Sequence, residues 1–202
     1  MKGKDDIHNF EKRLKRRIEL ITTSKNIVEE NKKILIEYYH NCIAEGITLA
    51  RIDKCLFHLY RISCMLGKPF IECNREDIVR VIENIERKNY SEWTKHDYKV
   101  ILKKFFKWLR KTEDYPEEVK WIRTTCRIKN NKLPEEILTE EEIKRIASSA
   151  DNFRDRAFVL VLYESGCRIG ELLSLRSKTI QFDEYGAVLF IIGKTGSRRV
   201  RI

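Results

Sequence analysis

Apolar residues recur at helical spacing through most of the first 137 positions. The spacing predicts helices over residues 24–46, 48–67, 74–85 and 91–111, after a loosely defined basic amphipathic segment over residues 6–20. Ser24 and Thr48 can cap two of these helices, and Asn74 with Asp77 three residues later is typical of a helix start. Gly46 and Gly67 stand where C-terminal glycines belong. The first part of the chain is therefore predicted to be a helical bundle.

The helix predicted over residues 91–111 has two distinct faces. One face carries the apolar side chains that we expect to meet the bundle, namely Tyr98, Ile101, Leu102, Phe105, Trp108 and Leu109. The opposite face carries a row of lysines at spacings of four, with only Glu92 and Asp97 as acidic company: Lys95, Lys99, Lys103, Lys107 and Lys111. Such a lysine row can follow a phosphate backbone. An ordinary solvated helix face is the alternative.

Residues 123–137 read as a connector between two domains, after a short helical turn near Pro116 and Trp121. Its cations are unopposed until Glu135: Arg123, Arg127, Lys129 and Lys132. A basic linker of this kind can lie along DNA, and a plain exposed hinge is the competing interpretation. The sequence thus predicts domains over residues 1–122 and 138–202, joined by this linker.

The second domain is predicted to begin at Thr139, which forms a capping box with Glu142 and is flanked by a Leu138–Ile143 staple. A helix over residues 152–165 follows and ends at Gly166, and its apolar run over residues 158–163 predicts a buried element. After a short helix over 169–175, the period changes to that of strands over 179–182, 187–192 and 198–202. The whole chain is therefore expected to be mainly α, with a short antiparallel β-sheet near its end.

The charge balance points to a polyanionic partner. The chain has 41 Lys and Arg against 31 Asp and Glu, a net charge of +10, of which +8 falls within residues 1–137. An anionic membrane is the competing polyanion, but no strongly apolar helix face without a role in the core is available to insert into it. These features favour nucleic acid over a membrane.

Composition narrows the class further. Apolar residues make up 42 % of 202 residues, enough for a packed core in each domain, and the longest apolar run, 157–163, has seven residues. No start resembling a secretion signal is present, so a cytoplasmic location is expected. Six scattered cysteines, without a C-x-x-C pair or a histidine cluster, are predicted to be small buried residues and not zinc ligands or disulfides, and no metal site is expected.

Two short motifs carry candidate chemistry, and the first is Arg168-x-x-Glu171 at a helix start. At this spacing the two side chains share a face, so Glu171 can orient the Arg168 guanidinium. A planar guanidinium suits the non-bridging oxygens of a phosphate. A simple helix salt bridge is the usual meaning of such a pair taken alone.

The second motif is Gly193-Lys194-Thr195-Gly196. It is not a P-loop, because position 188 is Val where that motif needs glycine, and strand residues follow instead of a helix. The alternatives are a hairpin that presents Lys194, followed by three arginines, and a plain surface hairpin.

In this order, the motifs resemble the tyrosine recombinase (phage integrase) family, most closely its compact integrases and Xer-type members. The features that match are Leu138-Thr139 with its following acids, the apolar helix, Gly166-x-Arg168-x-x-Glu171-Leu172, and a lysine hairpin 26 residues beyond Arg168. The resemblance implies a SAM-like core-binding helical domain, followed by the start of an α+β catalytic domain. It also implies double-stranded DNA as partner, further recombinase protomers on that DNA, and no cofactor.

The resemblance assigns roles to three residues. Arg168 is implied to be the first catalytic arginine, Glu171 its supporting acid, and Lys194 the proton donor to the departing 5′ oxygen. These roles are chemically reasonable, because phosphoryl transfer needs stabilised oxygen charge and a protonated leaving group. In the family a tyrosine attacks the phosphate and stores the bond energy in a 3′-phosphotyrosine, without ATP or metal.

The sequence departs from the family pattern after Lys194. A His-x-x-Arg motif, a further His or Trp and the tyrosine nucleophile are expected there, and none is found before Ile202. Tyr163, within an apolar helix, and Tyr185, in a turn, are not expected to replace the nucleophile. We therefore expect an N-terminal portion of a recombinase, either naturally shortened or expressed as a piece, that is inactive alone. A truncated non-catalytic regulator or decoy at recombination sites is the alternative, whereas a plain helical transcription factor would have no need of Arg168 and Lys194.

Overall fold

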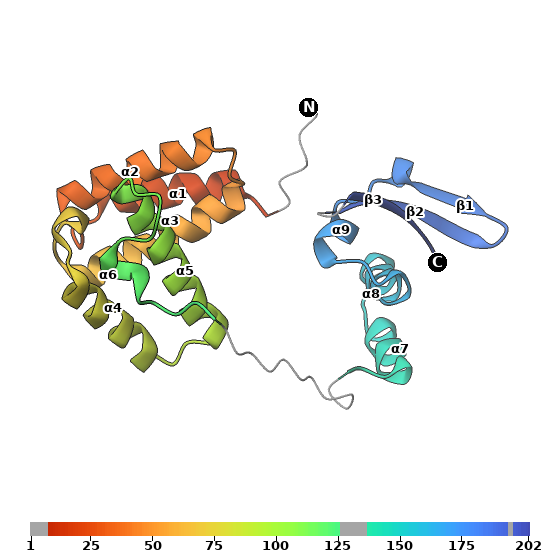
Figure 1. Ribbon diagram of the computed structural model, residues 1–202. Coiled ribbons are helices and arrows are strands. Elements are labelled where there is room, and N and C mark those ends of the chain that lie inside the picture. The colour runs from red at the N-terminus through yellow and green to blue at the C-terminus, as the bar shows by residue number, and fades with distance from the viewer. Residues whose placement is uncertain (1–7, 126–136, 194–195) are drawn as a thin grey trace. The chain divides into compact units, whose positions relative to one another are not determined.

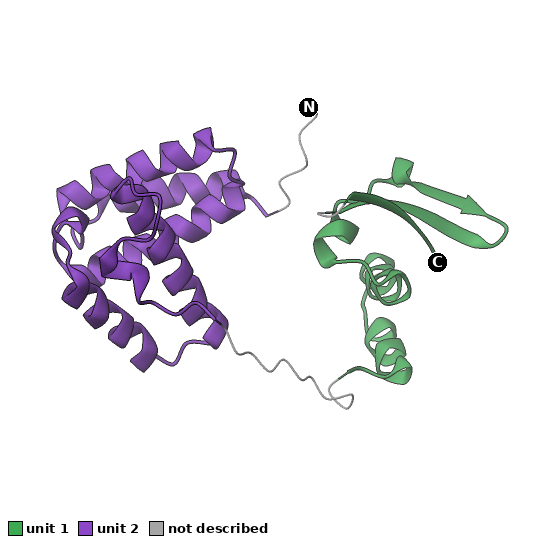
Figure 2. Cartoon of the chain, in the orientation of Figure 1, with its two compact units in different colours: residues 1–7, 130–202 green, residues 8–129 purple. Residues whose placement is uncertain are grey.

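The computed structural model describes residues 8–125, 137–193 and 196–202 (Figure 1). The described residues separate into two compact units, residues 8–125 in one and residues 137–193 with 196–202 in the other (Figure 2). Each unit has its own elements and its own buried residues, so the two are described in turn. No helix in the described part of the chain is long and apolar enough to cross a membrane.

The first unit is helical throughout its described residues. In chain order its elements are α1 (Phe10–Thr23), α2 (Glu29–Ala44), α3 (Leu49–Leu66), the 3-10 turn η1 (Phe70–Glu72), α4 (Arg75–Arg87), α5 (Glu92–Leu109) and the short α6 (Glu117–Lys120). Helix α3 packs against α1, α2, α4 and α5, and α6 packs against α4 and α5. The helical bundle expected from the spacing of apolar residues is confirmed.

Local signals set several of the helix ends in this unit. Asn74 and Asp77 exchange side-chain bonds to each other's backbone N–H groups at the start of α4. The hydroxyl of Ser91 accepts the N–H of Thr94 at the start of α5. Gly67 ends α3 in the left-handed conformation, with φ of 65°, which a residue without a side chain adopts at no steric cost.

The expected cap at Ser24 is wrong. Helix α2 begins at Glu29, and the residue before it is Val28, which has no capping side chain. The Ser24 hydroxyl instead accepts the N–H of Asn26 at 3.1 Å and lies 3.1 Å from the hydroxyl of Tyr60 on α3. A tertiary contact and a local turn thus use the oxygen that the sequence pattern assigned to the helix start.

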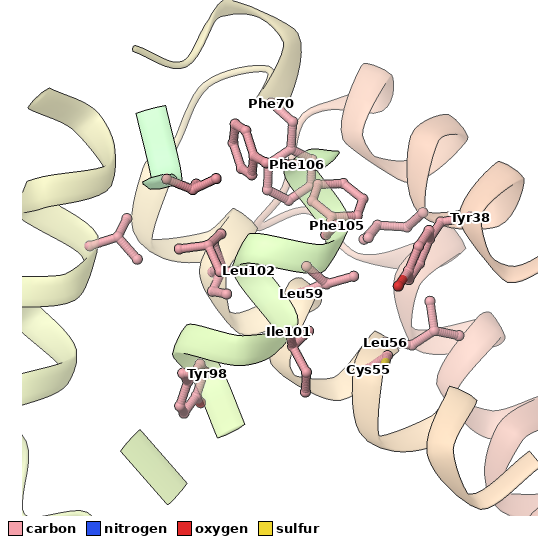
Figure 3. Packing of buried hydrophobic residues seen from close by; sticks show 14 of the residues in the cluster. Tyr38, Cys55, Leu56, Leu59, Phe70, Tyr98, Ile101, Leu102, Phe105 and Phe106 are labelled. Carbon is pink, nitrogen blue, oxygen red and sulfur yellow. The ribbon is translucent and has the colours of Figure 1, made fainter. Parts of the chain in front are cut away.

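Helix α5 supplies a large share of the buried core of the first unit (Figure 3). Its buried residues are Tyr98, Ile101, Leu102, Phe105 and Phe106. Figure 3 places Phe105 and Phe106 beside Phe70, and the Phe70 and Phe105 ring centroids are 4.8 Å apart in an edge-to-face arrangement. Tyr38 of α2 packs edge-on against Phe105 at 5.3 Å. The apolar face predicted for this helix is confirmed at its centre, and Phe106 extends it.

Two buried polar residues join separate elements of this core. Asn31 on α2 donates to the Ser63 hydroxyl at 2.8 Å and to the Lys68 carbonyl at 3.0 Å, and it accepts the Phe70 N–H at 2.7 Å. Asp53 on α3 is 2 % exposed and forms ion pairs with Arg13 and Arg17 of α1. Because buried polar groups are costly unless they are paired, these bonds fix how the helices fit together.

The second unit combines three helices with one small sheet. Its elements are α7 (Glu140–Ser148), α8 (Phe153–Ser165), α9 (Ile169–Leu173), the 3-10 turn η3 (Ser177–Thr179) and the strands β1 (Ile180–Asp183), β2 (Gly186–Gly193) and β3 (Gly196–Arg201). The strands pair antiparallel in the order β1-β2-β3, with Leu189 opposite both Ile180 and Val200. The capping box of Thr139 with Glu142 is present at the start of α7. The short antiparallel sheet expected from the sequence is confirmed.

The prediction that residues 158–163 are buried is wrong among the described residues. No residue of α8 is buried, and Leu160 and Tyr163 are 38 % and 45 % exposed. The buried apolar cluster of this unit consists of Cys167, Leu189 and Ile191. An apolar run becomes a core only where other elements cover it, and α7, α9 and one three-stranded sheet leave much of α8 uncovered.

The cysteines also differ from expectation at one position. Cys42, Cys55, Cys73 and Cys167 are buried, as predicted, whereas Cys64 on α3 is exposed. Cys126 lies outside the described residues. Burial raises the pKa of the Cys55 and Cys73 thiols to about 11, so both stay protonated at neutral pH.

Candidate phosphate-binding site

Arg168 and Glu171 meet at the start of α9, as their spacing predicts. Gly166 ends α8 in the left-handed conformation, and Arg168 caps the next helix with an extended backbone. The Arg168 N–H donates to Glu171 Oε2 at 3.1 Å, and Nη1 of the same arginine donates to Oε1 at 3.1 Å. The side chain of Glu171 is 7 % exposed and that of Arg168 is 66 % exposed. The glutamate is therefore a buried anchor for an arginine whose guanidinium faces solvent.

A second arginine, which the sequence did not single out, also binds Glu171. Arg198 on β3 donates from Nη2 to Oε2 at 2.7 Å and from Nη1 to Oε1 at 3.3 Å. The hydrogen bonds from Arg198, followed by those from the Arg168 backbone and side chain, lower the pKa of Glu171 to about 2. At neutral pH this carboxylate is ionised, so it serves as a fixed negative charge and not as a proton donor.

Gly193 at the end of β2 makes room for this cluster. A Cβ atom at position 193 would overlap Oε1 of Glu171 and lie 3.4 Å from Nη1 of Arg198. The strand backbone therefore approaches the carboxylate as closely as glycine alone allows. Lys194, which follows in the sequence, lies outside the described residues, between the end of β2 and the start of β3 at Gly196.

The first two lysines of the predicted row on α5 are neutralised by Glu86 of α4 and by Glu92 of α5 itself. Lys99 forms an ion pair with Glu86 of α4 at 2.5 Å, and Lys95 binds Glu86 at 3.6 Å and Glu92 at 3.1 Å. Along α5 itself, Glu92 and Asp97 are the acidic residues that accompany these lysines in the sequence. Asp97 is instead paired with Lys54 of α3. The approach of α4 and Lys54 to α5 is tertiary, and helical spacing within α5 does not reveal it.

The second half of the row is divided between packing and open surface. Lys103 donates to the carbonyl of Ile122 at 3.0 Å and lies over the Tyr115 ring. Lys107 and Lys111 are exposed, and within the described ranges no carboxylate lies at ion-pair distance from either. They line the edge of a cavity of about 770 Å³ together with two further exposed cations, Arg51 and Lys104. Among the described residues, Lys107 and Lys111 are thus the lysines of the predicted row that are exposed and have no carboxylate partner.

The predicted basic linker is mostly outside the described residues. Arg123 is described and exposed. Arg127, Lys129 and Lys132 fall within residues 126–136, which the structure does not describe.

Sequence comparison places the second unit in a known family. Residues 136–201 match the model of the phage integrase family. The chain is 33 % identical over 147 residues to the tyrosine recombinase XerA of Pyrococcus furiosus. The aligned segment covers 70 % of this chain and 47 % of the relative. It is 40 % identical over 80 residues to XerA of Pyrococcus horikoshii, or 37 % of this chain and 27 % of the relative. The chain thus spans about half or less of the length of these curated relatives.

Two solved structures share the fold. Both are crystal structures of the XerH site-specific recombinase bound to difH substrates, one a post-cleavage complex and the other a pre-cleavage complex. All of this chain aligns with each, over 67 % and 66 % of the recombinase chain, with TM-scores of 0.57 and 0.56 and sequence identities of 17 % and 19 %.

The chain thus combines a helical unit with an α+β unit. The α+β unit carries a solvent-facing arginine, Arg168, which is bonded to the buried carboxylate of Glu171. The family match over residues 136–201 and the similarity to the XerA tyrosine recombinases show that the chain is a member of the tyrosine recombinase (phage integrase) family.

Proposed function

We propose that this chain is the DNA-binding and partial catalytic portion of a site-specific tyrosine recombinase. The observation that carries the proposal is the buried Glu171 carboxylate, which holds the exposed guanidinium of Arg168 at the start of α9. The relatives named XerA are tyrosine recombinases, and the XerH neighbours bind difH DNA. Both facts support the same activity here.

Arg168 is proposed to hold the scissile phosphate. One of its side-chain donors, Nη1, is bonded to Glu171, so Nη2 and Nε are left for the non-bridging oxygens of a phosphodiester. An arginine fixed in this way before the reaction stabilises charge on the equatorial oxygens without having to reorganise. Glu171 is proposed to support Arg168, and Lys194 is proposed to protonate the departing 5′ oxygen.

The first unit is proposed to bind duplex DNA through its phosphates. The exposed cations at the C-terminal end of α5, Lys107 and Lys111, supply charge for this contact, with Arg123 and the cations of residues 127–132 continuing along the linker. Lys95, Lys99 and Lys103 belong to the same predicted surface, but they reach phosphate only by exchanging their present protein partners for it.

Salt dependence tests the electrostatic part of this proposal. If the chain contacts about six phosphates, its affinity for a duplex should fall on the order of a thousandfold between 50 and 200 mM salt. Replacing Lys107 and Lys111 with Gln should weaken binding to all sequences alike, because phosphate contacts carry no sequence information. The matched pair Lys95→Gln and Lys99→Gln should have a smaller effect, since Glu86 and Glu92 already neutralise these side chains. Affinity that is independent of salt would rule the proposal out.

Covalent trapping tests the catalytic part. On a nicked duplex that retains a 3′-phosphotyrosine, the 202-residue chain should yield no covalent complex, because no attacking group is assigned within it. A form extended through a His-x-x-Arg motif and a later tyrosine should yield one, and Arg168→Ala in that form should abolish it while preserving DNA binding. A covalent complex with the 202-residue chain would contradict the inactivity and point to Tyr163 or Tyr185. No complex with the extended form would favour a binding-only regulator.

A further inference from the structure

The carboxylate of Glu171 is shared by two arginines, Arg168 three residues before it and Arg198 27 residues after it. Each of its oxygens accepts one bond from Arg168 and one from Arg198, and the two bonds from Arg198 use a single guanidinium. We propose that Arg198 is a positioning residue, which fixes the plane of the Glu171 carboxylate and thereby the Arg168 guanidinium for a phosphate oxyanion. The inference rests on the proposed phosphate-binding role of Arg168.

The geometry explains why Arg168 needs this help. Its side chain is 66 % exposed and donates one hydrogen bond, at 3.1 Å, to Glu171. The single bond leaves the Arg168 guanidinium free to turn about it, whereas paired bonds from the planar guanidinium of Arg198 hold both carboxylate oxygens at once. Glu171 is 7 % exposed, so water has little access to replace donors that are removed. Without Arg198, each oxygen would retain one donor, both from Arg168.

The same contact joins the hairpin to helix α9. Arg198 lies on β3 opposite Ile191 of β2, and Gly193 at the end of β2 closes against the Glu171 carboxylate. The strands on either side of position 194 are therefore tied to the helix that begins beside Arg168. Arg198 is 38 % exposed, so it is a partly covered bridge and not a free surface cation.

Arg201 provides a matched control on the same strand. It binds Asp183 of β1 through two bonds of 2.8 and 2.7 Å, with side chains that are 50 % and 39 % exposed. Arg201→Gln removes one arginine and one bidentate pair from the hairpin without touching Glu171. An effect of Arg198→Gln that Arg201→Gln does not reproduce is thus specific to the Glu171 cluster.

The experiment is a titration of the 202-residue chain with inorganic phosphate, followed through the assigned Nε–H signal of Arg168 by nuclear magnetic resonance. In the native chain this signal should shift with phosphate. In Arg198→Gln the phosphate affinity at Arg168 should fall about tenfold, equivalent to the loss of one charge-assisted bond, and the Nε–H should exchange faster with water. Arg198→Lys should restore the charge but only part of the affinity, because it lacks the fork. Arg201→Gln should match the native chain.

The outcomes separate this inference from the proposed function. If phosphate leaves the Arg168 signal of the native chain unmoved, the proposed phosphate site itself fails. Suppose instead that phosphate shifts the Arg168 signal of the native chain, and that Arg198→Gln and Arg198→Lys bind phosphate as tightly as the native chain does. The positioning role of Arg198 is then wrong, while the phosphate site at Arg168 stands. Amide protection in β2 and β3 reports folding in every variant. Loss of that protection in both Arg198 variants would make Arg198 merely structural and overturn the inference.

Discussion

The two units of the chain bury their apolar side chains to very different extents. In the first, one continuous cluster includes side chains with 0 % exposure from α3, η1 and α5, such as Leu56, Phe70 and Phe105. In the second, the buried apolar cluster has three members, and Phe153 and Phe182 are 87 % and 82 % exposed. Both segments are rich in apolar residues, so composition alone does not produce a core. The difference is in how many elements surround each apolar face.

This contrast separates the stability of the chain from its proposed chemistry. The first unit has the packed interior from which most folding free energy comes. The second unit holds the Arg168–Glu171–Arg198 cluster on a small sheet, where ion pairs and one close glycine contact do much of the positioning. Variants in the first unit should therefore change stability, and variants in the cluster should change what the site binds.

The largest expected effect comes from Leu56→Ala in the first unit. Leu56 is 0 % exposed, so truncation removes buried contacts and leaves a cavity, at a cost of about 2–5 kcal/mol. Phe182→Ala in the second unit is the matched control, and it should change stability by less than about 0.5 kcal/mol because the ring already faces solvent. Amide exchange resolved by residue in the full chain measures both units at once. Equal losses of stability in the two variants would contradict the difference in burial between the two units.

A smaller effect is expected from Asn31→Ala. The change leaves the Phe70 N–H, the Ser63 hydroxyl and the Lys68 carbonyl without their partner, at a cost on the order of 2–3 kcal/mol. Asn41→Ala, which removes an exposed bond to Glu45, should cost less than about 0.5 kcal/mol. Denaturant unfolding followed in the first unit distinguishes the two. If the two variants lost the same free energy of unfolding, the buried amide of Asn31 would stabilise the first unit no more than the exposed amide of Asn41 does.

The sequence predicted those parts of the fold that depend on neighbouring residues. The capping boxes at Asn74 and Thr139 and the glycine after α3 involve atoms within four residues of each other, so a local pattern suffices to find them. The predicted helix cap at Ser24 is wrong because the Ser24 hydroxyl bonds instead to the hydroxyl of Tyr60, 36 residues away. Local propensity describes what a residue can do, and tertiary contacts decide which option is used.

The candidate site divides in the same way. The pairing of Arg168 with Glu171 follows from a spacing of three on a helix start, and the structure contains it. Arg198 was visible only as one of several cations after the lysine motif, because its partner lies 27 residues earlier. The strand pattern contained one signal, since Arg198 alternates with Val200, and Val200 packs against the buried cluster of this unit. A charged residue on such a face indicates a buried partner.

The smallest expected effect concerns pH and acts on the second unit alone. The folded-state pKa of Glu171 is about 2, below its ordinary value of 4.5, so the unfolded state binds more protons between these values. The stabilisation by this carboxylate should be complete above pH 4.5 and should be lost as the pH falls through 2. The stability of the second unit should therefore not change with pH near neutrality through this carboxylate, and should decrease only on acidification. Carbon-13 resonance of the Glu171 carboxyl in the full chain measures the midpoint directly.

Two variants sharpen this measurement. Arg198→Gln removes the largest cause of the lowered pKa, so the Glu171 midpoint should move up toward its ordinary value, whereas Arg201→Gln should leave it in place. Asp183, which Arg201 binds, should respond in the opposite pattern, because that arginine is the main cause of its own lowered pKa. A native midpoint near 4.5 would mean that the carboxylate is not clamped in solution. The second unit would then lack the fixed charge that holds Arg168, and the contrast between the units would extend from packing to the site itself.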